Sequence, residues 1–322
     1  PGTDFSEIRG QQGAKRAAEI AAAGGHNLLL IGTPGSGKTM LAKAMPSIMP
    51  QLTFGEALEI TKVHSVTGAF RGSGGIAAER PFRAPHHSAS LPSLVGGGPK
   101  AQPGEISLAH GGVLFLDELP EFSRDVLEAL RQPLEDREVT ITRASFRATY
   151  PADFMLVAAM NPCPCGYYGG RTSRCRCTPV QVERYRNRLS GPFLDRIDLQ
   201  VEMTEVGYEE IAGRSTGESS AVIRQRVEAA RQRQRERYQE EGILFNAQLA
   251  GEQINRYCPL TARAQAMVKK AFETMYMSGR GYGRIRKVAR TIADLAGEET
   301  IDAVHVAEAM QYRSLDKKYW GG

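Results

Sequence analysis

The sequence predicts an α/β fold in which a parallel β-sheet lies between helices and is followed by a smaller all-helical domain. Apolar runs of strand length at residues 28–31, 113–116 and 154–160 have the continuous hydrophobicity of parallel strands that are buried on both faces. The first run is followed by a helical pattern that Pro46 ends. From residue 249 onward the pattern is helical, which predicts a separate all-α domain.

A glycine-rich loop follows the first strand and matches the phosphate-binding pattern GxxxxGK[ST]. Its residues are Gly32, Thr33, Pro34, Gly35, Ser36, Gly37, Lys38 and Thr39. Glycines let the backbone curl so that several N–H groups point at one phosphate, and the following helix N-terminus adds a favourable dipole. Lys38 would reach the β- and γ-phosphates of ATP, and the hydroxyl of Thr39 would ligate Mg²⁺. The alternative is a chance glycine-rich turn, which the flanking strand and helix disfavour.

Polar residues follow the other two strands. Asp117 and Glu118 come directly after the second run, where Asp117 would hold Mg²⁺ and Glu118 would polarise the attacking water. Asn161 follows the third run, and its amide could orient that water or only cap the strand end. Further on, Arg196 lies between Asp195 and Asp198. It could pair within its own subunit or enter a neighbour's nucleotide site as an arginine finger, which requires a ring of subunits.

Three longer motifs carry a resemblance to a known family. Residues 80–90, 104–118 and 158–166 resemble one branch of the AAA+ ATPases, the magnesium-chelatase-like ComM (YifB) family. The resemblance extends from about Phe5 to about Leu315. Members of that family are usually longer and have an N-terminal domain similar to the C-terminal fold of Lon protease. We therefore expect this chain to correspond to the ATPase portion without that domain.

The resemblance implies roles for individual residues. The phosphate loop with Asp117 would bind ATP and Mg²⁺, and Asn161 would be the first sensor of the γ-phosphate. Arg196 would be the trans-acting arginine finger, and Arg280 would be the second sensor, a lid arginine that reads the γ-phosphate. The alternatives for that last role are its sequence neighbours Arg284, Arg286 and Arg290.

Two segments are expected to project from the core. The first, at about residues 65–103, is a Gly-, Pro- and Ser-rich insertion that suits substrate contact; its His86-His87 pair lacks companions with metal-ligand spacing. The second, at about residues 138–150, predicts a β-hairpin with Arg143 and Arg147 near a turn at Ala144-Ser145. In related ATPases an equivalent hairpin points into a central pore. These arginines could contact DNA phosphates there, or the hairpin could be an ordinary solvated one.

Four cysteines arrive in two close pairs, Cys163 with Cys165 and Cys175 with Cys177, with glycines between the pairs. Two pairs of thiolates on short loops suit a structural, tetrahedral Zn²⁺, although paired zinc ligands usually have two intervening residues rather than one. Unbound or redox-active thiols and an iron–sulfur cluster are the alternatives. Disulfides are disfavoured in the reducing cytosol, where we expect this nucleotide hydrolase to reside. Cys258 has no partner in the sequence and is expected to be a buried, inert thiol.

A length of 322 residues allows one large α/β core and a smaller domain. We expect residues 1–203 to form the AAA+ core, with the cysteine loop at 163–177 inside it. Residues 204–246 would be a linker and a long basic helix whose arginines are solvated or line a nucleic-acid path, and residues 247–322 would be the helical lid. The helices after residue 220 are expected at residues 221–241, 262–276, 283–297 and 301–312, the last one starting near Asp302.

Composition narrows the partners. The formal net charge of +5 favours an anionic partner without proving one. No apolar run approaches the roughly 18 residues of a membrane span, and the N-terminus resembles no targeting sequence, so we expect a cytoplasmic protein without a membrane partner.

Two classes of function remain. The first is a homo-hexameric ATP-driven motor, assembled with ATP or DNA, that acts on single-stranded or branched DNA. The ComM-family resemblance implies branch migration or helicase activity in the recombination of incoming DNA. The alternative is a protein-remodelling ATPase similar to the small subunit of magnesium chelatase, which the close cysteine pairs disfavour. A nucleotide-dependent scaffold with slow hydrolysis would require Glu118 or Arg196 to be ineffective.

Overall fold

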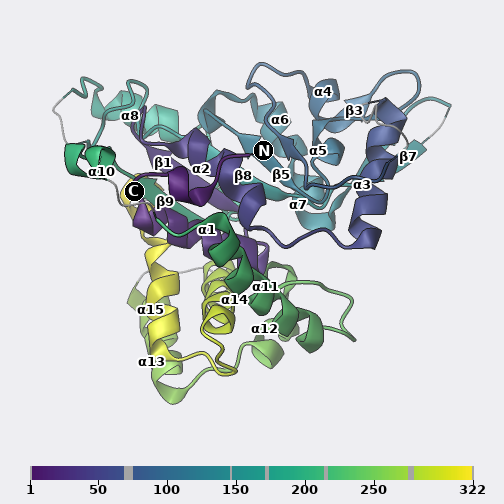
Figure 1. Cartoon of the computed structure of the whole chain (residues 1–322). Coiled ribbons are helices and arrows are strands. Elements are labelled where there is room, and N and C mark those ends of the chain that lie inside the picture. The colour runs from purple at the N-terminus through teal and green to yellow at the C-terminus, as the bar shows by residue number, and fades with distance from the viewer. Residues whose placement is uncertain are drawn as a thin grey trace.

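The computed structural model describes residues 2–68, 75–145, 147–170, 174–213, 217–274 and 279–320 of the chain. In Figure 1 an α/β part forms the upper body of the molecule, and a group of helices coloured green to yellow lies below it. The fold class is therefore the predicted one. Among the described residues, no helix is both long and apolar enough to cross a membrane.

The centre of the α/β part is a five-stranded sheet in the order β2-β5-β8-β1-β9, with every neighbouring pair parallel. Its strands are β1 (Leu28–Gly32), β2 (Phe82–Arg83), β5 (Val113–Leu116), β8 (Met155–Met160) and β9 (Leu199–Met203). Because the strands run the same way, they all end at one edge of the sheet, which we call the carboxyl edge. They all begin at the opposite edge, which we call the amino edge.

Helices surround this sheet and connect its strands. They are α1 (Gln12–Gly24), α2 (Lys38–Ala44), α3 (Phe54–Thr67), α4 (Leu91–Val95), α5 (Glu105–Leu108), α6 (Arg124–Ala129), α7 (Arg131–Asp136), α8 (Pro179–Arg186), α9 (Gly191–Leu194) and α10 (Tyr208–Ala212). Short 3₁₀ turns lie at Phe5–Glu7, Met45–Ile48, Leu119–Glu121 and Asn246–Gln248. Pro46 does end α2, and the chain continues directly as the second of these 3₁₀ turns.

The strands are buried on both faces, as their continuous apolar sequence predicts. Leu28 and Leu30 of β1 belong to the hydrophobic cluster that includes α1, whereas Leu29 and Ile31 belong to the cluster on the other face. This alternation follows from the two-residue period of a strand. The phosphate loop therefore extends from a strand that is fixed from both sides.

Two antiparallel hairpins accompany the sheet. The pair β3 (Gly96–Gly97) and β4 (Gln102–Pro103) lies beside the pair β6 (Glu138–Thr142) and β7 (Arg147–Pro151), and Figure 1 places β3 and β7 at the same end of the molecule. The hydroxyl of Tyr150 donates a 2.8 Å hydrogen bond to the carbonyl of Ala101, which joins them. Thr142 and Arg147 are the last pair of this ladder, so Arg143 follows the end of β6, whereas the sequence predicts it in the strand before an Ala144-Ser145 turn. Phe146 lies outside the described residues.

The C-terminal helices are α11 (Ser220–Arg237), α12 (Glu252–Tyr257), α13 (Ala262–Thr274), α14 (Gly279–Leu295), α15 (Ala303–Gln311) and α16 (Ser314–Trp320). Compared with the predicted ranges, α11 ends earlier and α14 begins earlier, because the glycines at its start are accommodated in the helix. Residues 275–278, which include the end of one predicted helix, are outside the described part. Asp302 is the N-cap of α15, as predicted, because its carboxylate accepts from the Ala303 N–H at 2.7 Å.

Several arginines of the long basic helix α11 bond within the chain rather than to solvent alone. Arg226 pairs with Glu19 of α1 at 2.7 Å, and Arg231 donates to the carbonyl of Ala22 at 2.9 Å. Arg237 pairs with the buried Asp294 of α14 at 2.6 Å.

The C-terminal helix α16 returns to the sheet, where its Lys318 pairs with Glu202 of β9. The last helix of the predicted lid therefore packs against the α/β part.

Candidate nucleotide site and cysteine cluster

The phosphate loop has the backbone that its glycines predict. It connects β1 to α2 at the carboxyl edge, and Gly35 and Gly37 adopt left-handed conformations with φ of 79° and 96°. At Gly32 a side chain has no room, because a Cβ would lie 2.6 Å from the carbonyl oxygen of Met203. The start of the loop therefore packs closely against the end of β9.

Lys38 lies at the centre of this loop. Its Nζ donates to the carbonyls of Gly32 at 2.6 Å and Thr33 at 3.1 Å, and to Oδ1 of Asn161 at 3.1 Å. Burial lowers the pKa of Lys38 to about 8, and the nearby Asp117 carboxylate opposes this shift only partly. An additional anion beside this ammonium would raise the pKa again, which suits a phosphate group.

Two polar pairs at the same place fit ATP and Mg²⁺. Within the described residues, the hydroxyl oxygens of Thr33 and Ser36 are buried without a hydrogen-bond partner, so the loop has polar atoms that a ligand could satisfy. The Thr39 hydroxyl donates to Oδ2 of Asp117 at 3.3 Å. A hydroxyl and a carboxylate that face each other are the oxygen ligands that Mg²⁺ prefers.

Glu118, the predicted water-activating residue, follows Asp117 in a left-handed conformation with φ of 52°. Its carboxylate Oε2 lies 3.2 Å from Nε2 of His87. The His86-His87 pair therefore has a partner in the nucleotide site. In the described part of the chain, these histidines belong to no metal-binding group.

Gln11 contacts the phosphate loop, although no sequence motif predicts this contact. Its side-chain amide donates to the carbonyl of Ser36 at 2.9 Å and to that of Thr204 at 2.5 Å. It thereby ties the segment before α1 and the end of β9 to the phosphate loop. A single glutamine outside any recognised motif carries no signal for this role.

Arg196 lies at the opposite, amino edge. Its backbone carbonyl accepts from Nδ2 of Asn27, the residue before β1, at 3.1 Å, and its guanidinium forms an ion pair with Glu135 of α7. Burial lowers the pKa of Arg196, and the nearby Arg131 and Arg280 lower it further. The five-residue strand β1 separates Asn27 from the phosphate loop. At 3.3 Å per residue this strand is about 16 Å long. Arg196 and Lys38 are therefore not brought together within one chain.

Arg280 differs from the three arginines that follow it in α14. Arg284 donates to the carbonyl of Asp195 at 2.7 Å, Arg286 to that of Cys258 at 2.5 Å and Arg290 to that of Glu299 at 2.6 Å, and all three are buried. The side chain of Arg280 is 62% exposed and lies 3.7 Å from the Asp195 carboxylate. Of these four arginines, Arg280 is therefore the one available to a ligand.

Arg196 and Arg280 line one cleft of about 580 Å³ together with Asn27, Asp195 and Arg284. No phosphate-loop residue lines it. The predicted hydrolysis set is thus divided in two: Lys38, Thr39, Asp117, Glu118 and Asn161 at the carboxyl edge, and Arg196 and Arg280 at the amino edge. The catalytic roles of these residues remain predictions.

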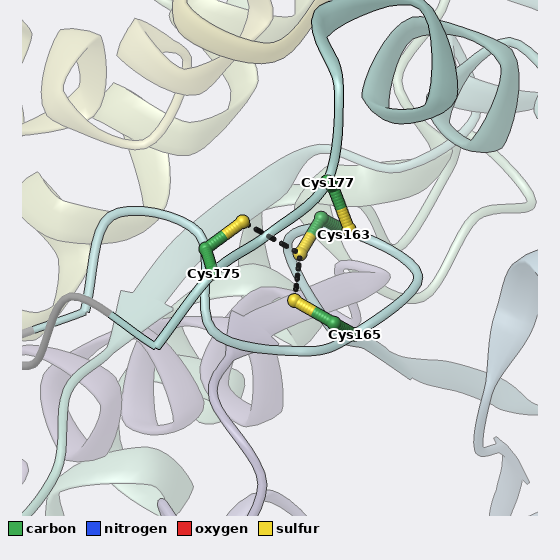
Figure 2. Close-up of side chains that lie close together, drawn as sticks. All are labelled: Cys163, Cys165, Cys175 and Cys177. Atoms are coloured by element: carbon green, nitrogen blue, oxygen red, sulfur yellow. Dashed lines mark hydrogen bonds between the residues drawn. The ribbon is translucent and has the colours of Figure 1, made fainter.

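The four paired cysteines converge, as Figure 2 shows. All four Sγ atoms lie within 4.8 Å of one another, and Cys163 Sγ is 3.3 Å from that of Cys165 and 3.8 Å from that of Cys175. Zn–S bonds of about 2.3 Å in a tetrahedron would place the sulfurs about 3.8 Å apart, so the cluster fits zinc. None of the described cysteines forms a disulfide, and Cys258 is buried away from the cluster, as predicted.

The charge of the cluster also favours a cation. Burial acts to raise the pKa of Cys165, but hydrogen bonds from the Tyr167 backbone and the neighbouring thiols lower it to about 6. Burial and the neighbouring cysteines raise the pKa of Cys177 to about 12. Deprotonation of one cysteine therefore disfavours deprotonation of the next, because the two negative charges repel each other. A divalent cation among the sulfurs would relieve this repulsion.

The cysteine loop packs on the nucleotide site. It begins two residues after Asn161, and the backbone of Gly166 lies so close to Pro34 that a Cβ there would be 2.8 Å from the proline ring. Gly170 lies against Thr33 in the same way, at 3.3 Å. The cysteine loop therefore supports one side of the phosphate loop.

The predicted DNA-contacting arginines lie on the hairpin as expected, but Arg143 is in its turn. Arg143 and Arg147 are exposed, and neither side chain has a hydrogen bond or ion pair among the residues that the structure describes. The Arg143 guanidinium lies against Gly97 of the adjacent hairpin, where an added Cβ would be 2.5 Å from its Nη2.

A parallel sheet with a phosphate loop after β1, an acidic pair after β5 and a polar residue, Asn161, after β8 is the arrangement of AAA+ P-loop proteins. The chain belongs to the magnesium chelatase ChlI family: residues 4–211 match the family described as magnesium chelatase, subunit ChlI, and residues 217–313 match the C-terminal part of that subunit. The predicted family resemblance is therefore confirmed.

Individual relatives agree with this assignment. The competence protein ComM of Haemophilus influenzae is 50% identical over 313 residues, which cover 97% of this chain and 60% of ComM. YifB of Escherichia coli is 48% identical over 316 residues, 98% of this chain and 61% of YifB. The magnesium-chelatase 67 kDa subunit of Chlorobaculum parvum is 30% identical over 164 residues, 49% of this chain and 23% of that subunit. The chain thus spans about 60% of the length of ComM and YifB.

Proposed function

We propose that this chain is the ATP-hydrolysing part of a ring-forming motor that acts on DNA. The observation that carries the proposal is the convergence at the carboxyl edge, where Lys38 contacts Asn161 and Thr39 contacts Asp117. A lysine in a loop of backbone donors, two oxygen ligands and a second, exposed carboxylate are the parts that phosphoryl transfer to water requires.

Each side chain has a defined task in this proposal. Lys38 and the loop N–H groups bind the phosphates of ATP, and Thr39 and Asp117 hold Mg²⁺. When bound, the metal ion neutralises charge that develops on the phosphates. Glu118 accepts a proton from the attacking water, and the amide of Asn161 orients that water. These are tasks of positioning and charge stabilisation, which supply most of the catalysis in this class of reaction.

The division of the site between two edges supports a ring. Arg196 and Arg280 line a cleft at the amino edge, and no phosphate-loop residue of the same chain lines that cleft. In a homo-hexamer the carboxyl edge of one subunit would dock on the amino edge of the next, and the arginines would complete the neighbour's site. Their acidic partners Glu135 and Asp195 would be exchanged for phosphate.

Three observations favour DNA as the substrate. Arg143 and Arg147 are exposed and unpaired on a projecting hairpin, where six copies would surround a threaded strand. The net charge of the chain is +5. The relative from Haemophilus influenzae is described as a competence protein. We therefore propose branch migration or unwinding of single-stranded or branched DNA as the output of the motor.

A protein-remodelling activity is the second candidate, and the match to magnesium chelatase subunits favours it. In that case ATP hydrolysis would change the conformation of a partner enzyme rather than move DNA. In both cases we propose that Cys163, Cys165, Cys175 and Cys177 hold a structural zinc ion, because all four ligand positions would be filled.

The testing experiment measures ATPase rate with and without single-stranded and branched DNA at two salt concentrations, while light scattering follows oligomer size. DNA-stimulated hydrolysis with ATP-dependent assembly would support the DNA motor. Replacing Arg143 and Arg147 by alanine should then lower the salt dependence of DNA binding, by about 0.7 in the log–log slope for each lost phosphate contact. Assembly without any response to DNA would favour protein remodelling.

A further inference from the structure

The carboxylate of Glu118 has one side-chain partner in the described part of the chain, and it is His87. The two atoms, Glu118 Oε2 and His87 Nε2, lie 3.2 Å apart. The Glu118 side chain is 56% exposed, so without this contact little would restrict its rotation. The backbone N–H of Glu118 is occupied by Asp117 Oδ1 at 2.8 Å and does not orient the carboxylate.

Strand pairing explains why His87 is at this position. In the parallel pair β2–β5, Phe82 lies opposite Val113 and Arg83 lies opposite Leu114. Continuing that register by four residues on each strand brings His87 opposite Glu118, beyond the carboxyl edge. The short strand β2 is secured by Arg83, which donates two hydrogen bonds of 2.7 Å to Glu105.

The ring of His87 is itself fixed by packing. It stacks on His86 with ring centroids 4.1 Å apart, and it meets the edge of the buried Phe122 at 6.4 Å. Nδ1 of His86 is 2.7 Å from the hydroxyl of Ser88, which holds the stacked ring in turn. A constrained imidazole thus faces an exposed carboxylate, so the histidine orients the glutamate rather than the reverse.

We propose that His87 is a positioning residue for water activation: it binds one oxygen of Glu118 so that the other faces the attacking water. This inference rests on the proposed ATP hydrolysis. In that step the water oxygen bonds to the γ-phosphorus, the bond from that phosphorus to the bridging oxygen of ADP breaks, and Glu118 takes the water proton. The products are ADP and phosphate, and the proton then passes from Glu118 to solvent. His87 neither gains nor loses an atom.

The test is steady-state ATP hydrolysis with Mg²⁺ by the His87→Ala and His87→Gln variants. His87→Ala should lower kcat about tenfold, a part of the 10²–10⁴-fold that a general base contributes, with KM and binding of a non-hydrolysable ATP analogue unchanged. His87→Gln keeps a donor and should recover most of the loss. Thermal unfolding of each variant checks that the fold is intact.

His110 offers a matched control, because its Nε2 lies 3.0 Å from Glu59 in a similar His–Glu pair on the amino side of β5. His110→Ala should leave kcat within about twofold, because this pair lies on the amino side of β5 and does not include Glu118. In a Glu118→Gln background, single-turnover hydrolysis should not change further when His87 is replaced.

Three results would overturn the inference: an unchanged kcat, a raised kcat, or an effect of His87→Ala that persists with Glu118→Gln. In each of these the parent chain still hydrolyses ATP, so the proposed function stands. A parent chain that binds but does not hydrolyse ATP under any condition would reject both.

Discussion

At the carboxyl edge of the sheet, Lys38, Asn161 and the Thr39–Asp117 pair contact one another around a glycine-rich loop that has buried, unpaired hydroxyls. At the amino edge, by contrast, Arg196 and Arg280 are already neutralised by acids of their own chain, Glu135 and Asp195. At the carboxyl edge Lys38 is the cation of the site, whereas the two arginines lie at the amino edge, where there is no phosphate loop.

In the proposed ring, this contrast would leave the site inactive in one chain and complete it between two. The acids that neutralise the arginines are about one-third to one-half exposed, with side-chain exposures of 49% for Glu135 and 34% for Asp195. Ion pairs of this kind contribute about 0–1 kcal/mol. In the proposed ring, exchanging them for a phosphate of the neighbouring subunit would therefore cost little, and we expect assembly to switch hydrolysis on.

The largest expected effect is that of Arg196→Ala. An arginine finger contributes about 10³–10⁵-fold to kcat, so this variant should lose hydrolysis while it still binds an ATP analogue. Mixing it with the Lys38→Ala variant should restore turnover, because about a quarter of randomly mixed interfaces then combine an intact Lys38 with an intact Arg196. Titration of the mixture with a steady-state assay measures this.

The control for that experiment is Arg188→Ala, which removes an exposed arginine paired with Glu121 at 3.0 Å. It should hydrolyse ATP like the parent chain. If the mixture of inactive variants stays inactive although light scattering shows mixed rings, the two edges do not share a site.

Glu118→Gln separates binding from chemistry at the carboxyl edge. Loss of the general base should lower kcat by about 10²–10⁴-fold, and ATP should remain bound in an assembled ring. Filter binding of radiolabelled ATP together with light scattering detects this trapped state. The nearby Glu121→Gln is the control; a normal rate for Glu118→Gln would remove Glu118 from water activation.

Much of the carboxyl edge could be predicted because its signals are local. The apolar run before Gly32, the spacing from Gly32 to Thr39 and the Asp117-Glu118 pair after a strand each specify their own geometry over a few residues. The two cysteine pairs likewise predict a cluster, and in the structure all four sulfurs lie close together. Local sequence can specify these features because the backbone between their parts is short.

The remaining features depend on long-range packing, which local patterns do not encode. The contact of His87 with Glu118 follows from the register of β2, a strand of two residues that is too short to give a periodic signal. Arg280 was one of four candidate arginines in the sequence. Only the packing of α14 against Asp195 distinguishes it, by burying Arg284 and leaving Arg280 exposed.

At the amino edge, Arg280→Ala should lower kcat less than Arg196→Ala does. Loss of one hydrogen bond to a charged group is worth about 1.5–3 kcal/mol, which corresponds to a kcat about 10- to 100-fold lower. Arg263→Ala, which removes an exposed arginine paired with Asp302 at 2.9 Å, is the control and should have no effect. A loss confined to Arg284 variants would instead indicate that α14 only supports Asp195.

The smallest effect on the nucleotide is expected from the cysteine cluster, because it acts on the phosphate loop indirectly, through the packing of Gly166 on Pro34 and of Gly170 on Thr33. Replacing Cys163 and Cys175 by serine should release zinc, detectable by elemental analysis, and lower the melting temperature. ATP-analogue affinity should fall about three- to tenfold, equivalent to one net hydrogen bond of about 0.7–1.4 kcal/mol. Cys258→Ser should leave the metal content unchanged, since that thiol lies outside the cluster.

If the cysteine loop does not support the phosphate loop, the metal will be lost with no change in nucleotide affinity. If the parent chain contains no zinc, the cluster has another role. Arg196 lies at the opposite edge of the sheet, beside Asn27. Zinc removal should therefore leave intact the activity that Arg196 of a treated chain gives to an untreated neighbour.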